Sequence, residues 1–212
     1  MAGVPIACFL ANIYLSELDT QFEKEKIVYC RYSDDIIIFA PTLEEIERGR
    51  DIILSHINKL DLLVNREKEV YTKPEDKWSF LGFSYQLGKI DISDISQTKL
   101  KAKMRRKARA LYRWRISKNI APEKAIKAFI RVFNNKFFYT TDTHETNWSR
   151  WYFPIINIDK SLKEIDNYMQ SCIRYIYSGK HNKSNYNFRY KQMKNLGYET
   201  LVNNWYKSKD KN

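Results

Sequence analysis

The sequence is poor in cysteine and glycine. Of 212 residues, three are cysteine and six are glycine. The cysteines, Cys8, Cys30 and Cys172, are widely spaced and include no Cys-x-x-Cys pair. An odd number at such spacing argues against a disulfide framework and favours reduced thiols. The histidines His56, His144 and His181 lack the paired spacing of zinc ligands, so a zinc site is not expected.

Long apolar runs are also absent. No stretch reaches the roughly eighteen consecutive apolar residues of a membrane-spanning helix. Met1 is not followed by a basic region, an apolar core and a small-residue cleavage site, so no secretory signal is visible. These patterns predict a cytoplasmic protein with no membrane partner.

Positive charge is in excess. The net charge is +12 and the pI is about 9.5, which favours a polyanionic partner. At 212 residues, the chain is long enough to bury a sizeable core in one or two domains.

Two neighbouring carboxylates, Asp34 and Asp35, lie between apolar runs at 27–30 and 36–39. Both runs are β-branched or aromatic and short, which predicts strand, tight turn, strand. Because unpaired buried charge is costly, a carboxylate pair at such a bend is well explained by a bound cation. The alternative is an ordinary hairpin turn whose aspartates point to water.

Around this pair, four blocks occur in order: Gly3-Val4-Pro5 with Phe9–Leu15 and Leu18-Asp19, then Arg31–Asp35, then Leu62–Asn65 with Lys68, then Trp78–Phe83. They resemble motifs B, C, D and E of the reverse transcriptases of bacterial retroelements, the group II intron-encoded proteins and retrons. The resemblance implies an α+β fold. Residues 1–92 would be the distal half of a polymerase palm, an antiparallel sheet with helices, and residues 93–212 an α-helical thumb.

The departures from the family pattern also carry expectations. The family's motif A strand, with its own metal-binding Asp, would lie before Met1. The chain is therefore expected to be the C-terminal part of a larger polymerase, inactive without an N-terminal fingers and palm segment of the same protein. Motif B is short, with Ile6-Ala7-Cys8 in place of a longer segment, and Ser33 stands where relatives carry Ala or another small residue.

The resemblance assigns chemical roles. Nucleotidyl transfer needs charge neutralisation and alignment, which two Mg²⁺ ions supply through a few carboxylates and the substrate phosphates. Asp34 and Asp35 are the metal candidates, for Mg²⁺ or its substitute Mn²⁺. Because neighbouring strand residues face opposite ways, we expect Asp34 to be the direct ligand, although the sequence permits the reverse. Lys68 would approach the departing pyrophosphate, or it is a solvated lysine. Further contacts to nucleotide and primer–template are expected from Gly3, Pro5, Tyr32, Ser33, Leu81 and Gly82.

A basic run occupies residues 99–115, where nine bases occur with no acid. Without acids to pair at i,i+4, such density favours contact with phosphates over a merely solvated helix face. Ala108, Leu111 and Tyr112 would still give this helix a packing stripe. The candidates for nucleic-acid backbone contact are Lys99, Lys103, Arg105, Arg106, Arg109 and Arg113.

Periodicity and capping signals predict the remaining elements. Helices are expected at 12–22, 43–60, 97–118, 122–138 and 158–177, with a further pair at 183–207 broken at Gly197. Thr42 and Ser96 are expected N-caps, Thr42 within a capping box with Glu45. Strands are expected near 68–71, 78–85 and 90–92, and a loop at 140–147.

Three functions compete at this point. The leading hypothesis is an RNA-directed DNA polymerase that uses an RNA template, a DNA primer and deoxynucleoside triphosphates. The second is a nucleic-acid-binding module without catalysis, such as a maturase or a scaffold in a defence system. The third is a nucleotidyltransferase that uses no template.

Overall fold

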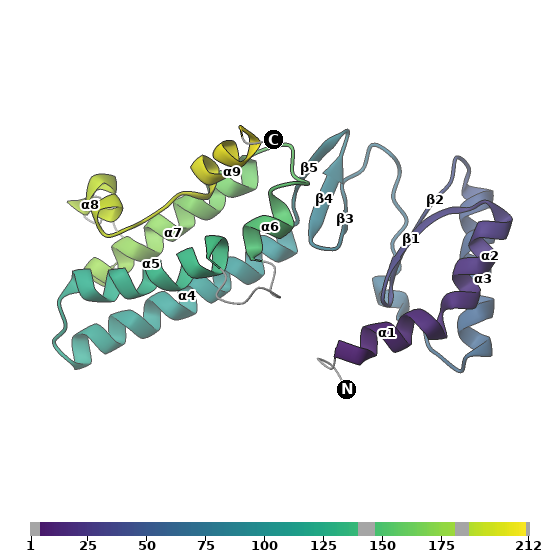
Figure 1. Ribbon diagram of the computed structural model, residues 1–212, viewed down its shortest axis with the longest axis horizontal. Helices are drawn as coiled ribbons and strands as arrows, with labels where there is room; N and C mark the ends of the chain where they lie inside the picture. The colour runs from purple at the N-terminus through teal and green to yellow at the C-terminus, as the bar shows by residue number, and fades with distance from the viewer. Residues whose placement is uncertain (1–4, 140–146, 181–186, 211–212) are drawn as a thin grey trace. The chain divides into compact units, whose positions relative to one another are not determined.

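A computed structural model describes residues 5–139, 147–180 and 187–210, and the chain divides into two compact units, Met1–Tyr71 and Thr72–Asn212 (Figure 1). The expected α+β class is confirmed, because each unit combines helices with a small antiparallel sheet. None of the described helices is both long and apolar enough to cross a membrane.

The first unit is a β-hairpin packed on helices. Its elements are α1 (Pro5–Tyr14), α2 (Ser16–Glu25), β1 (Val28–Tyr32), β2 (Asp35–Phe39), α3 (Leu43–Lys59) and the 3₁₀ turn η1 (Arg66–Lys68). Its small core contains Leu18, Phe22 and Ile57. Gly49 of α3 lies so close to Ile38 of β2 that an added Cβ would stand 3.2 Å from the isoleucine side chain. A glycine on the helix therefore lets it pack closely on the hairpin.

The expected helix over 12–22 is divided at Leu15. The Ser16 hydroxyl donates to the Ile13 carbonyl at 2.8 Å, a local bond that competes with regular helix geometry. The expected N-cap of α3 is confirmed, since the Thr42 hydroxyl accepts from the Glu45 backbone N–H at 3.3 Å.

The expected strand at 68–71 is wrong. In its place the Asn65 side chain accepts from the Glu67 N–H and starts η1, and Glu69 forms an ion pair with Arg50 of α3. This segment is thus tied to a helix side chain, and within the described residues it pairs with no strand. Ion pairs between distant residues leave no local periodicity in a sequence.

The second unit begins with a three-stranded meander of β3 (Trp78–Phe80), β4 (Phe83–Gln86) and β5 (Lys89–Ile92). The single strand expected at 78–85 is therefore two strands. Leu-Gly pairs form both turns, Leu81-Gly82 and Leu87-Gly88, with positive φ at all four residues. Positive φ at both central residues is the pattern of a type I′ turn, which matches the twist of paired strands.

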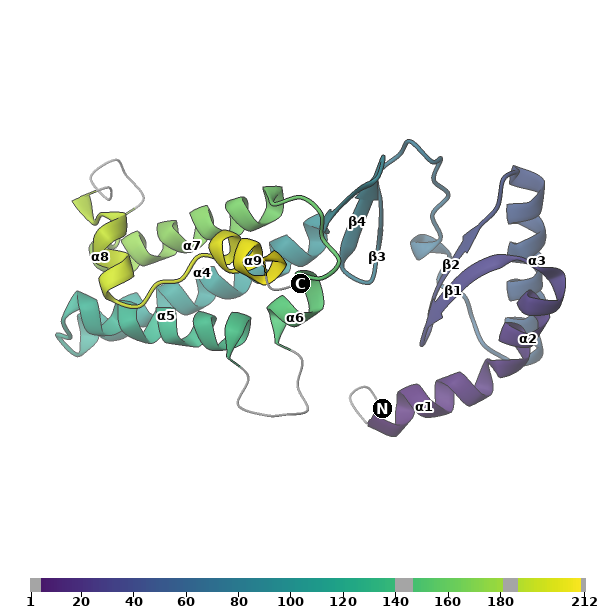
Figure 2. The same ribbon diagram turned by 45° about the horizontal axis from the view of Figure 1, so that its top comes forward.

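Helices make up the rest of this unit. They are α4 (Asp94–Ser117), α5 (Pro122–Phe138), α6 (Trp148–Tyr152), α7 (Lys160–Ser178), α8 (Tyr190–Asn195) and α9 (Leu201–Lys209). Helices α4, α5 and α7 lie side by side (Figures 1 and 2) and share a core rich in aromatic rings. The N-cap of α4 is Ser93, not the expected Ser96; the Ser93 hydroxyl accepts from the Ser96 N–H.

The boundary between the compact units lies before β3, whereas the sequence suggested a division at residue 92. Phe83 and Ile92 of the meander are buried in the same core as Leu100 of α4. A polar network reinforces this packing, because the Gln97 side chain donates to the Ile92 carbonyl and to Ser161 of α7. The loop expected at 140–147 lies, except for Asn147, outside the described residues.

Candidate active site

The turn of the β1–β2 hairpin carries both candidate carboxylates. Tyr32 pairs with Asp35, so Ser33 and Asp34 form a two-residue turn. Ser33 has a φ of 58°, and positive φ at the first turn position is a feature of the primed turns that such hairpins prefer. The expected strand, tight turn, strand is confirmed, with Asp34 in the turn and Asp35 at the start of β2.

Both carboxylates face outward. Asp34 and Asp35 are exposed, and in the described ranges neither side chain forms a hydrogen bond or an ion pair with another residue. Side chains opposite each other in an antiparallel pair share a face, so Asp35 lies on the same face as the exposed Tyr32. The turn therefore presents carboxylate oxygens that no cationic side chain of the described residues neutralises.

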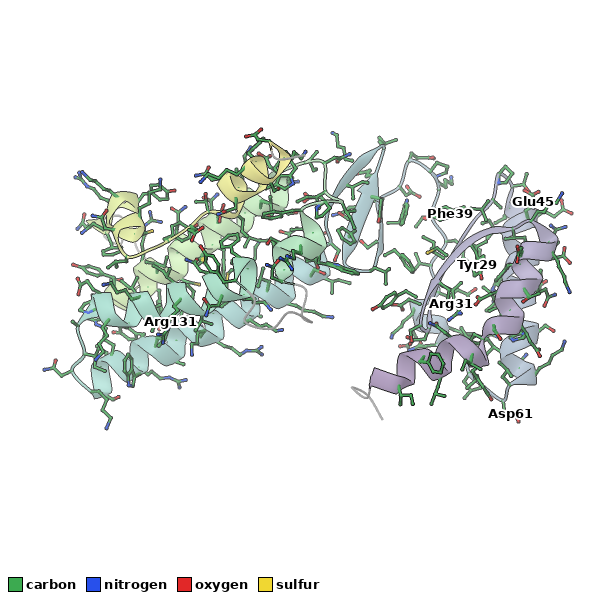
Figure 3. All side chains as sticks on the ribbon, in the orientation of Figure 1. Tyr29, Arg31, Phe39, Glu45, Asp61 and Arg131 are labelled. Atoms are coloured by element: carbon green, nitrogen blue, oxygen red, sulfur yellow. The ribbon has the colours of Figure 1, made fainter. Side chains whose placement is uncertain are left out.

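The opposite face of β1 is held to the helices by a polar network (Figure 3). The Arg31 guanidinium donates to both carboxylate oxygens of Asp19, from Nε at 2.9 Å and from Nη2 at 2.5 Å. Its Nη1 donates to Asn12 Oδ1 at 3.0 Å and to the Ser33 carbonyl at 3.1 Å. The Tyr29 hydroxyl donates to Asp19 at 2.6 Å. Through Arg31, helices α1 and α2 are connected directly to the turn.

The electrostatics of this network follow from the fork between Arg31 and Asp19. The hydrogen bond from Arg31 holds the pKa of the Asp19 carboxyl below its ordinary value, and the same bond raises the pKa of Arg31. Burial, together with the bond to Asp19, raises the pKa of Tyr29 to about 12. All three groups therefore keep a single charge state near neutral pH, and the network does not loosen by titration there.

The other predicted site residues of the first unit fall in different places. Gly3 lies outside the described residues, and Pro5 begins α1. Lys68 ends η1, where it is exposed and its backbone N–H donates to the Asn65 carbonyl. The exposed position suits either of its interpretations, a lysine that meets a phosphate or a solvated one.

Leu81 and Gly82 belong to the second unit, in the turn between β3 and β4. An added Cβ at Gly82 would stand 2.8 Å from the Tyr152 hydroxyl and 3.1 Å from the Ser96 hydroxyl. Packing of the turn against α6 and α4 thus accounts for this glycine without a primer. A role in primer contact for Leu81 or Gly82 remains a prediction.

The basic run lies on α4, and the structure separates its nine bases into two groups. A stripe of Gln97, Leu100, Met104, Ala108 and Leu111 is buried, as the expected packing stripe requires. The bases therefore do not surround the helix. The six predicted backbone contacts are exposed and form no ion pair among the described residues: Lys99, Lys103, Arg105, Arg106, Arg109 and Arg113.

The three other bases of the run are partly buried, and two of them contact the protein itself. Lys101 forms an ion pair with Glu164 of α7 at 3.2 Å. Arg115 donates to the carbonyls of Ile176 and Tyr177 near the end of α7, which places a cation at the negative end of that helix. These two bases have structural partners, while the exposed six are available to a partner molecule.

Comparisons with known proteins agree with the geometry of the hairpin. Residues 2–85 match the family described as reverse transcriptase (RNA-dependent DNA polymerase). This part of the chain is therefore similar to reverse transcriptases. The retron Ec86 reverse transcriptase of Escherichia coli is 26% identical over 106 residues, which cover 48% of this chain and 33% of that protein. The chain thus matches about one third of the length of this relative.

Reverse transcriptases generally use divalent metal ions, and the donor chemistry of the turn fits such an ion. Asp34 and Asp35 offer hard carboxylate oxygens, which Mg²⁺ prefers, and Mg²⁺ keeps several waters or phosphates in its shell. In the described part of the chain, no group of three or more His, Cys, Asp or Glu side chains is close enough to form a metal cage. The turn can therefore supply part of a coordination shell.

Arg31, Asp19 and Asn12 fall within the blocks that resemble the family motifs, but the sequence pattern gave none of them a role at the turn. One signal was present. The period of a strand places Tyr29 and Arg31 on one face, and a charged side chain on a buried face needs a partner. Only the structure shows that this face is the less exposed one. The partners themselves, on α1 and α2, could not be identified without the fold.

Proposed function

We propose that the protein is part of an RNA-directed DNA polymerase, in which Asp34 and Asp35 bind the catalytic divalent ions. The observation that carries this proposal is the pair of exposed carboxylates at a hairpin turn, within a segment that matches the reverse transcriptase family model. Deoxynucleoside triphosphates, an RNA template and a DNA primer are the proposed substrates.

The chemistry follows from charge. In nucleotidyl transfer, bound Mg²⁺ ions neutralise the phosphates and align the primer hydroxyl. The role of this chain is to hold the turn rigid, with Asp34 and Asp35 directed toward the ions. A further carboxylate from a fingers and palm segment would complete the shell, so we expect the 212-residue chain alone to bind nucleic acid without extending a primer.

Primer extension tests this proposal. A preparation in which the chain is part of, or is complemented by, the fingers and palm segment should incorporate only the nucleotide complementary to the template. Incorporation that ignores the template would favour the non-templated nucleotidyltransferase. Robust extension by the 212-residue chain alone would contradict the need for a complementing segment.

The second unit supports nucleic-acid binding by a separate observation. Six exposed bases on α4 lack acidic partners in the described ranges, and at such spacing they repel one another unless anions screen them. We propose that this face of α4 follows a phosphate backbone with little sequence preference. The same surface would serve a polymerase thumb or a module without catalysis.

Salt dependence tests the basic face. Each lost phosphate contact should reduce the slope of log affinity against log salt by roughly 0.7–0.9. Replacing Arg105, Arg106 and Arg109 by Gln should therefore flatten the slope by about two to three units for RNA and DNA alike. The matched control replaces three exposed bases of α5, Lys124, Lys127 and Arg131, by Gln, which removes the same formal charge.

A smaller effect of the control would localise the contacts to α4. Equal effects would mean that binding responds to net charge and not to this face. An unchanged slope in the α4 variant, with its fold intact by circular dichroism, would contradict the proposed surface.

A further inference from the structure

Arg31 lies directly before the Tyr32-Ser33-Asp34-Asp35 turn, and its side chain is directed away from the exposed face. It is only 7% exposed, and it makes four hydrogen bonds. Two go to Asp19 on α2, one goes to Asn12 on α1, and one goes to the backbone of the turn itself. The guanidinium therefore connects three separate segments, as its planar set of donors allows.

The bond to the turn has a geometric consequence. The Ser33 carbonyl, which accepts from Arg31, belongs to the peptide plane that joins Ser33 to Asp34. Ser33 has a φ of 58°, a conformation that costs about 1 kcal/mol or more in a residue other than glycine and persists only where the surroundings hold it. Fixing this plane fixes the direction in which the Asp34 side chain leaves the backbone.

Asp19 in turn fixes Arg31. The bidentate fork orients the guanidinium plane, and the carboxylate balances its charge. Because the Asp19 carboxylate neutralises the charge of Arg31, this arginine does not weaken the attraction of the nearby turn for a cation. The fork and the bond to Ser33 together leave little freedom for the turn to rotate.

We propose that Arg31 is a positioning residue for the metal-binding turn, which it holds through the Ser33 carbonyl while Asp19 and Asn12 hold the guanidinium. This inference rests on the proposed function for its metal-binding part. The alternative is that Arg31 only joins the hairpin to the helices and stabilises the unit.

The test uses the 212-residue chain and the variant Arg31→Lys. Lysine keeps the charge, but a single ammonium cannot fork Asp19 and also reach Ser33 and Asn12. The matched control is Arg50→Lys, which makes the same substitution in a second Arg–carboxylate ion pair of the same unit, with Glu69 in the segment after α3. Two readouts are needed, the order of the turn and its affinity for a metal.

Order is measured by the ¹H–¹⁵N heteronuclear NOE at residues 33–35. The wild-type values should resemble those of the flanking strands. Arg31→Lys should lower them selectively, while Arg50→Lys should leave them unchanged. Unchanged values in Arg31→Lys, or an equal decrease in Arg50→Lys, would overturn the proposal whatever the chain does with metals.

Affinity is measured by Mn²⁺ titration, through the selective broadening of the Asp34 and Asp35 amide signals. Loss of a residue that orients a metal ligand typically weakens metal binding about tenfold or more. Arg31→Lys should therefore need about tenfold more Mn²⁺ for half-maximal broadening, and Arg50→Lys should match the wild type. A wild-type Mn²⁺ response in Arg31→Lys would overturn the positioning role.

The two readouts distinguish failure of the metal site from failure of the positioning role of Arg31. Absence of broadening at Asp34 in the wild type would contradict the metal site, and the NOE comparison would still decide whether Arg31 holds the turn. If Arg31→Lys does not fold, Asp19→Asn replaces it, because it keeps the shape of the acceptor and removes its charge. A turn as ordered in Asp19→Asn as in the wild type would then contradict the proposal.

Discussion

The two units differ in how much of their apolar surface is buried. In Thr72–Asn212, aromatic and aliphatic side chains from α4, α5 and α7 fill one core, and the bases stand outside it. In Met1–Tyr71 the core is small, and large apolar side chains such as Phe9, Leu10 and Ile13 are exposed. Near the turn of the first unit, polar contacts take the place of apolar packing, because the Arg31–Asp19 ion pair holds β1 and both Asp34 and Asp35 are exposed.

The two units are therefore held together by different kinds of interaction. The second unit gains its stability from burial of apolar surface, and the six exposed bases of α4 are available to a polyanion. The first unit holds the turn that is proposed to bind metal with hydrogen bonds and an ion pair, which specify geometry more than they stabilise. Exposed apolar surface commonly marks an interface. Because this surface is not buried within the unit, it does not stabilise the fold, and we expect the first unit to be the less stable part of the isolated chain.

The largest expected effect on stability is in the core of the second unit. Phe129 is fully buried, with its ring centroid 4.8 Å from that of Phe133, and Phe129→Ala should lower the free energy of unfolding of that unit by about 3–5 kcal/mol. Phe9→Ala, at a side chain 62% exposed, should change the stability of the first unit by less than about 0.5 kcal/mol. Chemical denaturation followed by circular dichroism would measure both changes. Equal losses would mean that Phe9 is packed in the protein and that the contrast between the units is false.

Acid should affect the units in opposite directions. Asp166 is buried and accepts from the Tyr198 hydroxyl and from the Leu201 and Val202 N–H groups, and burial raises its pKa to about 6. Between about pH 4 and 6 the folded state then binds more protons than the unfolded state, so stability falls as pH rises, by up to about 3 kcal/mol. Asp19 has a lowered pKa, so its contribution is present above about pH 4 and is lost on further acidification.

The variant Asp166→Asn isolates the pH-dependent contribution of Asp166 to the stability of the second unit. It should destabilise the second unit more at pH 4 than at pH 7, because only the wild-type side chain becomes charged between these values. Urea denaturation of the wild type and the variant at both pH values measures the difference. A constant difference would show that Asp166 ionises as readily in the folded protein as in the unfolded chain.

A smaller effect is expected at the two Leu-Gly turns. Gly82 and Gly88 both have positive φ, but only Gly82 faces a close neighbour, the Tyr152 hydroxyl. Gly88→Ala should cost about 1 kcal/mol for backbone strain alone, and Gly82→Ala about 1 kcal/mol more for the contact. Adding Tyr152→Phe, which removes the hydroxyl, should recover part of the extra cost. If thermal denaturation gives equal losses of stability for Gly82→Ala and Gly88→Ala, the turn at Gly82 is not in close contact with α6.

The sequence predicted elements whose cause is local. The bend between two β-branched runs, the Thr42 cap and the helix that starts at Pro122 all depend on neighbouring residues, and the structure contains them. The strand expected at 68–71 failed because Glu69 is bound by Arg50, nineteen residues away. The role of Arg31 was missed for the same reason, since its partners Asp19 and Asn12 lie on other elements.

The boundary between the two units also depends on contacts between residues far apart in the sequence. Composition changes at residue 93, yet Phe83 and Ile92 are buried with α4 and α7. Family patterns locate motifs along the chain, while compact units are defined by packing between residues far apart in sequence.

The central claim is that chemistry belongs to the turn of the first unit and backbone binding to α4 of the second. The most direct measurement compares Asp34→Asn with the triple variant of Arg105, Arg106 and Arg109 in an active, complemented polymerase. Affinity for primer–template and the single-turnover rate at saturating substrate are measured for each. Asp34→Asn should lower the rate at least about 100-fold with nearly unchanged affinity, since it removes a ligand charge and keeps the volume. The triple variant should weaken affinity and keep the rate. Wild-type turnover in Asp34→Asn would contradict the claim.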